Sequence, residues 1–134
     1  TKSIIEDKPI DVYNNGNMKR DFTYIDDIID GMLSVLDKPP KSNQFDLTLS
    51  DAPFRVLNIG NNKPISLEEF IECIEKALSK KAIKNELPMQ PGDVPVTYAN
   101  IDEINKEFGF NPKTNINHGI QKFVDWYVEY ESKN

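Results

Sequence analysis

The stretch IDVYNNGNMKRDFTYIDDI, residues 10–28, changes from strand-like to helical patterning and so decides the fold class. Its β-branched and aromatic residues before an Asn-Asn-Gly predict a short strand over 10–16 that enters a turn. Residues 20–24 predict a brief return strand. From Ile25 the apolar residues fall at helical spacing, which predicts a helix that ends before a Pro-Pro pair. This alternation of strand and helix is typical of an α/β protein.

The rest of the chain continues the alternation. Residues 41–53 and 89–99 are polar or proline-containing and predict loops. The other expected elements are a strand over 54–60, a helix that follows the capping box of Ser66 and Glu69, a strand over 82–88, a helix capped by Asn100 and ended by Gly109, and a helix opened by Asn115. The strand over 54–60 is apolar on both faces, as in a parallel strand between two helix layers. Because few other strands are available to flank it, we expect an incomplete sheet and a piece of a longer protein.

Composition and charge disfavour several classes of function. The 134 residues carry a net charge of −6, which argues against binding to duplex DNA or anionic lipid, and a mean hydropathy of −0.55, as expected of a soluble protein. One cysteine excludes an internal disulfide framework, and one histidine disfavours a multi-histidine metal site or a Ser-His-Asp triad. No stretch approaches the roughly 20 apolar residues of a membrane span, and the polar start lacks a signal-peptide core. We therefore expect no nucleic-acid partner, no membrane association and a cytoplasmic location.

Three segments in order carry a family resemblance: residues 10–28, RVLNIGNN at 55–62 and LPMQPGDVP at 87–95. Together they resemble the carboxy-terminal part of the NAD-dependent nucleotide-sugar epimerases and dehydratases, the extended short-chain dehydrogenase/reductase family. Within it they are most similar to the bacterial UDP-glucuronate 4-epimerase group. The resemblance runs from Pro9 to about Tyr130. It implies a UDP-sugar partner and an intact enzyme that uses NAD to oxidise C4, lets the keto sugar rotate and reduces it again.

Two motifs of this family do not occur in the sequence. The family holds the NAD pyrophosphate with GxxGxxG at a helix N-terminus and uses a Tyr-x-x-x-Lys pair for acid/base work, and neither pattern is found here. The resemblance thus implies that residues 1–134 are the nucleotide-sugar-binding C-terminal portion, without the main Rossmann domain. In the intact enzyme, residues 24–62 are expected to join the sheet of that nucleotide domain. The chain alone is expected to hold no NAD and no metal and to be inactive.

Arg20 is the first candidate for the substrate site. The resemblance implies that it contacts the nucleotide diphosphate, which a planar guanidinium can grip in a way that Lys cannot. The alternative is that Arg20 pairs on the surface with Asp21, Asp26 or Asp27, which would contribute little to stability. Asp26 and Asp27 stand at the start of a predicted helix, where serving the helix dipole is a better interpretation than acid/base chemistry.

Four further residues are candidate substrate contacts. The resemblance implies a uracil pocket at Val12 and Tyr13 and a ribose contact at Asp93. Gln90 stands where UDP-galactose 4-epimerases carry a second phosphate-binding arginine, and this departure favours the UDP-glucuronate branch. Each position also has a plainer interpretation, since a strand aromatic is more often part of a core and an aspartate after glycine is common in turns.

Other hypotheses about the whole chain stay open. It could be a stand-alone nucleotide-sugar-binding module, a portion of a related epimerase or dehydratase acting on another UDP-sugar, or a structural protein whose motifs bind nothing. The intact enzyme is expected to be a homodimer. The isolated chain is expected to self-associate, because the strand at 55–59 and its preceding helix, if they belong to the nucleotide domain of the intact enzyme, leave an unpaired edge and an apolar face that invite pairing with another chain.

Overall fold

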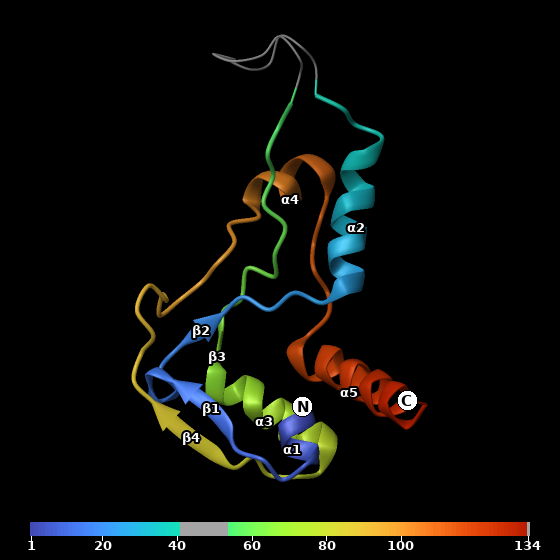
Figure 1. Ribbon diagram of the computed structural model, residues 1–134. Coiled ribbons are helices and arrows are strands. Elements are labelled where there is room, and N and C mark those ends of the chain that lie inside the picture. Colours follow the sequence, from blue (N-terminus) through green and yellow to red (C-terminus); the bar gives the residue numbers. More distant parts are fainter. Residues whose placement is uncertain (41–53, 134) are drawn as a thin grey trace.

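The computed structural model describes residues 1–40 and 54–133, so the loop predicted over 41–53 lies outside the described residues. The helices are α1 (Lys2–Ile5), α2 (Ile25–Leu36), α3 (Leu67–Leu78), α4 (Asp102–Phe108) and α5 (Ile116–Ser132), with a short 3-10 helix, η1, at Asn14–Gly16. The strands are β1 (Ile10–Tyr13), β2 (Lys19–Arg20), β3 (Ile65–Ser66) and β4 (Lys84–Leu87). Figure 1 shows β1, β4, α3 and α5 at one end of the molecule and α2 with α4 at the other. The predicted α/β class is confirmed.

The described strands form two small sheets. Strands β1 and β4 pair in parallel, with Tyr13 opposite Leu87. Strands β2 and β3 pair antiparallel, with Arg20 opposite Ile65. Because β1 and β4 run in the same direction, their carboxyl ends lie at one edge of the sheet. The turn after β1 and the loop after β4 therefore begin side by side, and β2 follows directly from that turn (Figure 1).

Two clusters of buried side chains hold the elements together. The first lies between α3 and α5 and consists of Ile4, Cys73, Ile74, Ile120 and Val124. The second joins α4 to α2 and to the extended segment 54–59, through Ile101, Ile104 and Phe110 packed against Val35, Leu57 and Ile59. Gly31 allows the close approach of α2 in this second cluster, since a Cβ there would lie 3.2 Å from side-chain atoms of both Ile59 and Phe110.

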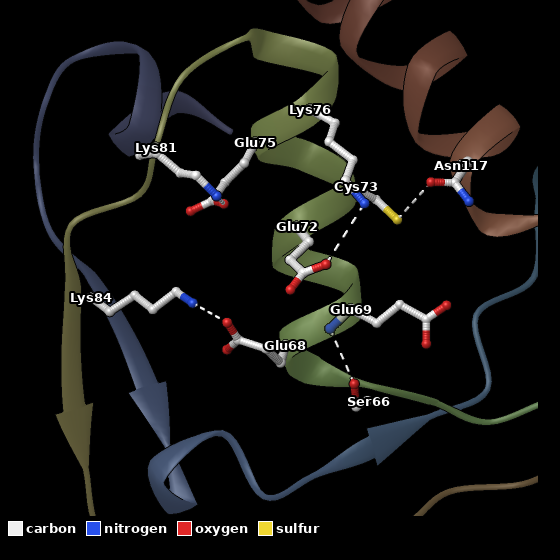
Figure 2. Close-up of polar contacts among 10 residues, drawn as sticks. All are labelled: Ser66, Glu68, Glu69, Glu72, Cys73, Glu75, Lys76, Lys81, Lys84 and Asn117. Carbon is white, nitrogen blue, oxygen red and sulfur yellow. Dashed lines mark hydrogen bonds and ion pairs between the residues drawn. The ribbon is translucent and has the colours of Figure 1, made fainter.

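The helix starts predicted at Ser66 and Asn115 are confirmed. The Ser66 hydroxyl accepts the Glu69 N–H at 3.1 Å, and the Asn115 side chain accepts the His118 N–H at 2.9 Å. Figure 2 shows the Ser66 cap at the start of α3 and, further along this helix, Cys73 facing Asn117 of α5. The Cys73 thiol donates to the Asn117 side-chain oxygen at 3.2 Å, and burial raises the pKa of this thiol. Packing between α3 and α5 thus includes one polar contact.

Two buried carboxylates fix loops to helices. Glu75 of α3 accepts the Ala82 N–H at 2.9 Å and pairs with Lys81, and the hydrogen bond from Lys81 is the main cause that lowers the pKa of this carboxyl. Asp27 of α2 is 5% exposed and accepts the N–H groups of Lys113 and Thr114 at 3.1 and 3.0 Å. The role predicted for Asp27 at the helix dipole is therefore incomplete, because its carboxylate ties α2 to the loop before α5.

Several predicted elements differ from the structure, and the strand predicted over 82–88 is confined to β4, Lys84–Leu87. The strand predicted over 54–60 is wrong: this segment belongs to no strand of the described structure, and its Leu57 and Ile59 pack on the second cluster instead. The return strand predicted over 20–24 is confined to Lys19–Arg20, because the chain leaves the ladder where the Asp21 side chain takes main-chain donors. Helix α4 begins one residue later than predicted, with Ile101 as its N-cap, although Asn100 accepts the Asp102 N–H at 2.9 Å. The left-handed end of α4 at Gly109, φ 73°, is confirmed.

Candidate functional site

The guanidinium of Arg20 is held by three acceptors from the loop after β4 and from its own strand. Its Nη2 donates to Asp93 Oδ1 at 2.8 Å, and its Nη1 donates to the carbonyl oxygens of Lys19 at 2.9 Å and Pro95 at 3.4 Å. The two side chains are 26% and 34% exposed, so the ion pair is partly screened by protein and still open to solvent. Arg20 thus pairs with Asp93, and not with the neighbouring aspartates 21, 26 and 27 that the alternative interpretation named.

Main-chain contacts bring Asp93 to Arg20 across 73 positions of sequence. The Lys19 N–H donates to the Pro95 carbonyl at 2.8 Å, the Thr97 N–H donates to the Lys19 carbonyl at 3.2 Å, and Lys19 forms a parallel bridge with Val96. Before this contact the loop turns tightly, with Gly92 at φ 84° and the Asp93 N–H donating to the Gln90 carbonyl at 3.2 Å. The loop and β2 therefore lie side by side and present their side chains to one another.

This pairing leaves hydrogen-bonding capacity on both partners. A guanidinium has five N–H donors, and within the described part of the chain Arg20 uses three, which leaves the Nε–H and one Nη2 N–H. Asp93 Oδ1 accepts from Arg20 and from the Val94 N–H at 2.8 Å, whereas Oδ2 receives no donor from the described residues. Free donors of a cation beside a free carboxylate oxygen can bind a ligand that carries both anionic oxygens and hydroxyl groups.

The other predicted contact residues differ in how much of each side chain is exposed to solvent. Val12 is 2% exposed and its side chain packs in the protein interior, so only its main chain is available to a ligand. Tyr13, the last residue of β1, is half-buried, and Gln90 is exposed in the loop after β4. Because β1 and β4 are parallel, both residues lie toward the edge that also carries Asp93. The structure thus gathers Tyr13, Gln90, Asp93 and Arg20 toward one edge and places the Val12 side chain in the core.

Asp21 is a residue of this region that sequence reasoning did not select. Its Oδ2 accepts the N–H groups of Asn62 at 3.0 Å and Ala99 at 3.1 Å, and its Oδ1 accepts the Lys63 N–H at 3.3 Å. The donors come from two segments far from Asp21 along the chain, and main-chain donors leave no residue-type signal in a sequence. Asp21 therefore could be found only from the fold.

The starts of helices α2 and α3 carry acidic side chains, which disfavour the pyrophosphate of a dinucleotide such as NAD. A pyrophosphate binds where main-chain N–H groups and the helix dipole are free of negative side chains. Helix α3, which follows strand β3, begins with the Ser66 side-chain cap and has Glu68 and Glu69 in its first turn. Helix α2 has Asp26 and Asp27 in its first turn. Both helix starts would repel a pyrophosphate.

The described ranges, 1–40 and 54–133, contain neither a membrane-spanning helix nor a cluster of metal-binding side chains. No helix there is long and apolar enough to cross a membrane. No group of three or more His, Cys, Asp and Glu side chains in these ranges could hold a metal ion.

Comparison with known proteins identifies relatives along nearly the whole chain. Protein CapI of Staphylococcus aureus is 50% identical over 139 residues, which covers 99% of this chain and 42% of that protein. UDP-glucuronate 4-epimerase 1 of Arabidopsis thaliana is 41% identical and covers 100% of this chain and 32% of its own length. The crystal structure of UDP-glucuronic acid 4-epimerase from Bacillus cereus in complex with UDP-glucuronic acid and NAD superposes with a TM-score of 0.78 at 29% identity, over 96% of this chain and 38% of that one. The chain thus spans less than half the length of these relatives.

A family model described as GDP-mannose 4,6 dehydratase matches residues 2–123. This match covers most of the 134 residues and includes all three segments that carry the resemblance. The named relatives add epimerases of UDP-glucuronate to the same group. The chain therefore belongs to the nucleotide-sugar epimerase and dehydratase family that this model describes.

Proposed function

We propose that this chain is the UDP-sugar-binding part of an NAD-dependent 4-epimerase that acts on UDP-glucuronate. The observation that carries the proposal is the Arg20–Asp93 pair, which holds two free N–H donors beside a free carboxylate oxygen. In this proposal Arg20 binds the diphosphate and Asp93 accepts from a ribose hydroxyl. Tyr13 packs near the uracil ring, Val12 contributes main-chain groups alone, and Gln90 lies near the phosphates in the exposed loop after β4.

The chemical step belongs to residues beyond those described. The solved Bacillus cereus relative contains NAD, whereas helices α2 and α3 of this chain begin with acidic side chains that disfavour a pyrophosphate. We propose that the chain alone holds no NAD and does not interconvert UDP-glucuronate and UDP-galacturonate. The family resemblance also supports a homodimeric intact enzyme in the cytoplasm. A portion of an enzyme for another UDP-sugar and a stand-alone binding module remain alternatives, since Arg20 and Asp93 recognise the nucleotide and not the sugar.

Calorimetric titrations with UDP, UMP and uridine test the binding role. We expect the affinity to fall in that order, because UDP offers Arg20 the most anionic oxygens and uridine offers none. Inorganic pyrophosphate serves as a control for unspecific attraction to a cation, and is expected to bind more weakly than UDP because it lacks the ribose and the base. A folded chain that binds none of the nucleotides, or binds uridine as well as UDP, would contradict the proposal.

We propose further that residues 24–62 belong to the sheet of the nucleotide-binding domain in the intact enzyme. Helix α2 exposes a row of apolar side chains, each between 44% and 71% exposed: Ile25, Ile29, Met32, Leu33 and Leu36. Phe54 and Val56 of the neighbouring extended segment are 53% and 79% exposed. An apolar surface of this kind marks a contact face.

In the isolated chain this exposed face is expected to cause self-association. Light scattering should give a mass above the 15.4 kDa of one chain that rises with concentration. The double variant Leu33→Glu, Leu36→Glu should lower that mass, because both side chains are exposed and the charges repel in any apolar contact. A constant monomer mass for the unmodified chain over a wide concentration range would refute the expectation.

A further inference from the structure

The Asp21 carboxylate joins the end of β2 to two segments that are distant in the sequence. It accepts main-chain N–H groups of Asn62 and Lys63 from one segment and of Ala99 from the other. No lysine or arginine of the described residues forms an ion pair with it, so these main-chain donors satisfy its charge. These three contacts connect the residue after β2 with two segments that are remote in the sequence.

The segment that Asp21 fixes at Ala99 is the one that carries the partners of Arg20. Asp93 and Pro95 supply acceptors to the guanidinium, and the same loop continues through the Lys19–Val96 bridge to Ala99. The loop is thus held to β2 on both sides of Arg20: by the Lys19 main chain on one side and by the Asp21 carboxylate on the other. The contact between Asp21 and Ala99 thus adds to the main-chain contacts of Lys19 in restricting movement of the loop that carries the Arg20 acceptors.

Gly60 shows that this junction is tightly packed. A Cβ at Gly60 would lie 2.4 Å from the Ala99 Cβ and 3.0 Å from Asp21 Oδ2. The Ala99 Cβ is bonded to the main chain and cannot rotate away. The absence of a side chain at Gly60 therefore lets the turn at 60–63 approach both the carboxylate and Ala99.

We propose that Asp21 is a positioning residue for Arg20, because its carboxylate fixes the loop whose Asp93 and Pro95 oxygens hold the guanidinium. Asp21 itself touches no ligand in this account. The prediction for UDP affinity rests on the proposed function, whereas the prediction for the position of Arg20 in the free protein does not.

The test compares Asp21→Asn with Asp27→Asn. In each variant an amide NH₂ replaces one carboxylate oxygen and faces a main-chain donor, so both variants should lose stability. Asp27 receives two main-chain N–H groups in the same manner, but they belong to the loop before α5 and not to the loop that holds Arg20. Asp27→Asn is thus the matched control for loss of stability alone.

Side-chain NMR of the free protein gives the direct readout. The chain has two arginines, Arg20 and Arg55, and Arg55 pairs with Glu103 and Glu107 of α4, so it is an internal reference. Asp21→Asn should shift and broaden the guanidinium resonances of Arg20 and leave those of Arg55 in place, and Asp27→Asn should move neither. Unchanged Arg20 resonances in Asp21→Asn would overturn the proposal. If this variant fails to fold, Asp21→Glu, which keeps both oxygens, takes its place in the same comparison.

UDP titration supplies the second readout through a double-mutant cycle. Asp21→Asn is expected to raise the Kd for UDP about tenfold, and to change it by less than about twofold when Arg20 is already alanine. Equal losses in both backgrounds would show that Asp21 does not act through Arg20. If the unmodified chain does not bind UDP, the proposed function fails, and the NMR comparison alone decides whether Asp21 positions Arg20.

Discussion

Arg20→Ala is expected to raise the Kd for UDP by roughly 10²- to 10⁴-fold, since it removes two available N–H donors and each hydrogen bond to a charged group contributes about 1.5–3 kcal/mol. The guanidinium keeps the Nε–H and one Nη2 N–H available while Asp93 and two carbonyl oxygens hold it in place. Alanine removes the free donors and leaves Asp93 without its cation. The half-exposed Asp93 carboxylate then repels the phosphates, which adds to the loss.

Two further variants test whether the shape of the Arg20 guanidinium matters and whether the effect is specific to Arg20. Arg20→Lys keeps the positive charge but loses the planar fork, so its Kd should lie between those of the unmodified chain and the alanine variant. Arg55→Ala removes the other arginine, which pairs with Glu103 and Glu107, and should leave the Kd for UDP unchanged. Calorimetric titration of all three variants with UDP measures these Kd values. Equal affinity of Arg20→Ala and the unmodified chain would remove Arg20 from the site.

Ile104→Ala is expected to lower the free energy of unfolding by about 2–5 kcal/mol, the range for large-to-small substitution in a packed core. The Ile104 side chain, on α4, is 1% exposed. It belongs to the cluster that packs α4 against α2 and the extended segment 54–59. That segment has no strand neighbour in the described structure, so it is held by packing on this cluster together with the ion pairs of Arg55 with Glu103 and Glu107.

Urea unfolding with Ile83→Ala as the control measures this effect. Ile83 is 54% exposed, so the same chemical change there should cost less than about 1 kcal/mol. The two substitutions remove the same atoms, so the difference between their losses of unfolding free energy is due to the burial of Ile104. Similar losses for Ile104→Ala and Ile83→Ala would mean that the second cluster is not a packed core.

Local signals in the sequence predicted the helices well. Ser66 and Asn115 cap α3 and α5 as expected, because a cap is a contact between a side chain and an N–H three residues ahead. The left-handed residue at Gly109 is likewise a local feature. The strand predicted over 54–60 failed because a strand exists only when another strand pairs with it, and its own residues carry no information about the neighbour.

The candidate site was predictable in part. The family resemblance selected Arg20 and Asp93, but their direct ion pair depends on the contact between Lys19 and Val96, which no spacing in the sequence predicts. The alternation of β1 did not reveal that the Val12 side chain faces the interior rather than a ligand. The roles of Asp21 and Asp27 were missed for a shared reason, since both carboxylates bind main-chain N–H groups of remote segments.

The central claim is that this chain binds the nucleotide of a UDP-sugar at the Arg20–Asp93 pair. Mapping of amide and arginine side-chain NMR shifts during a titration with UDP tests it most directly, because it reports both binding and its place. We expect saturable shifts at Arg20, Tyr13 and the loop from Gln90 to Asp93, with Arg55 and α4 unaffected. Saturable shifts confined to other parts of the chain, or none at all in a folded chain, would contradict it.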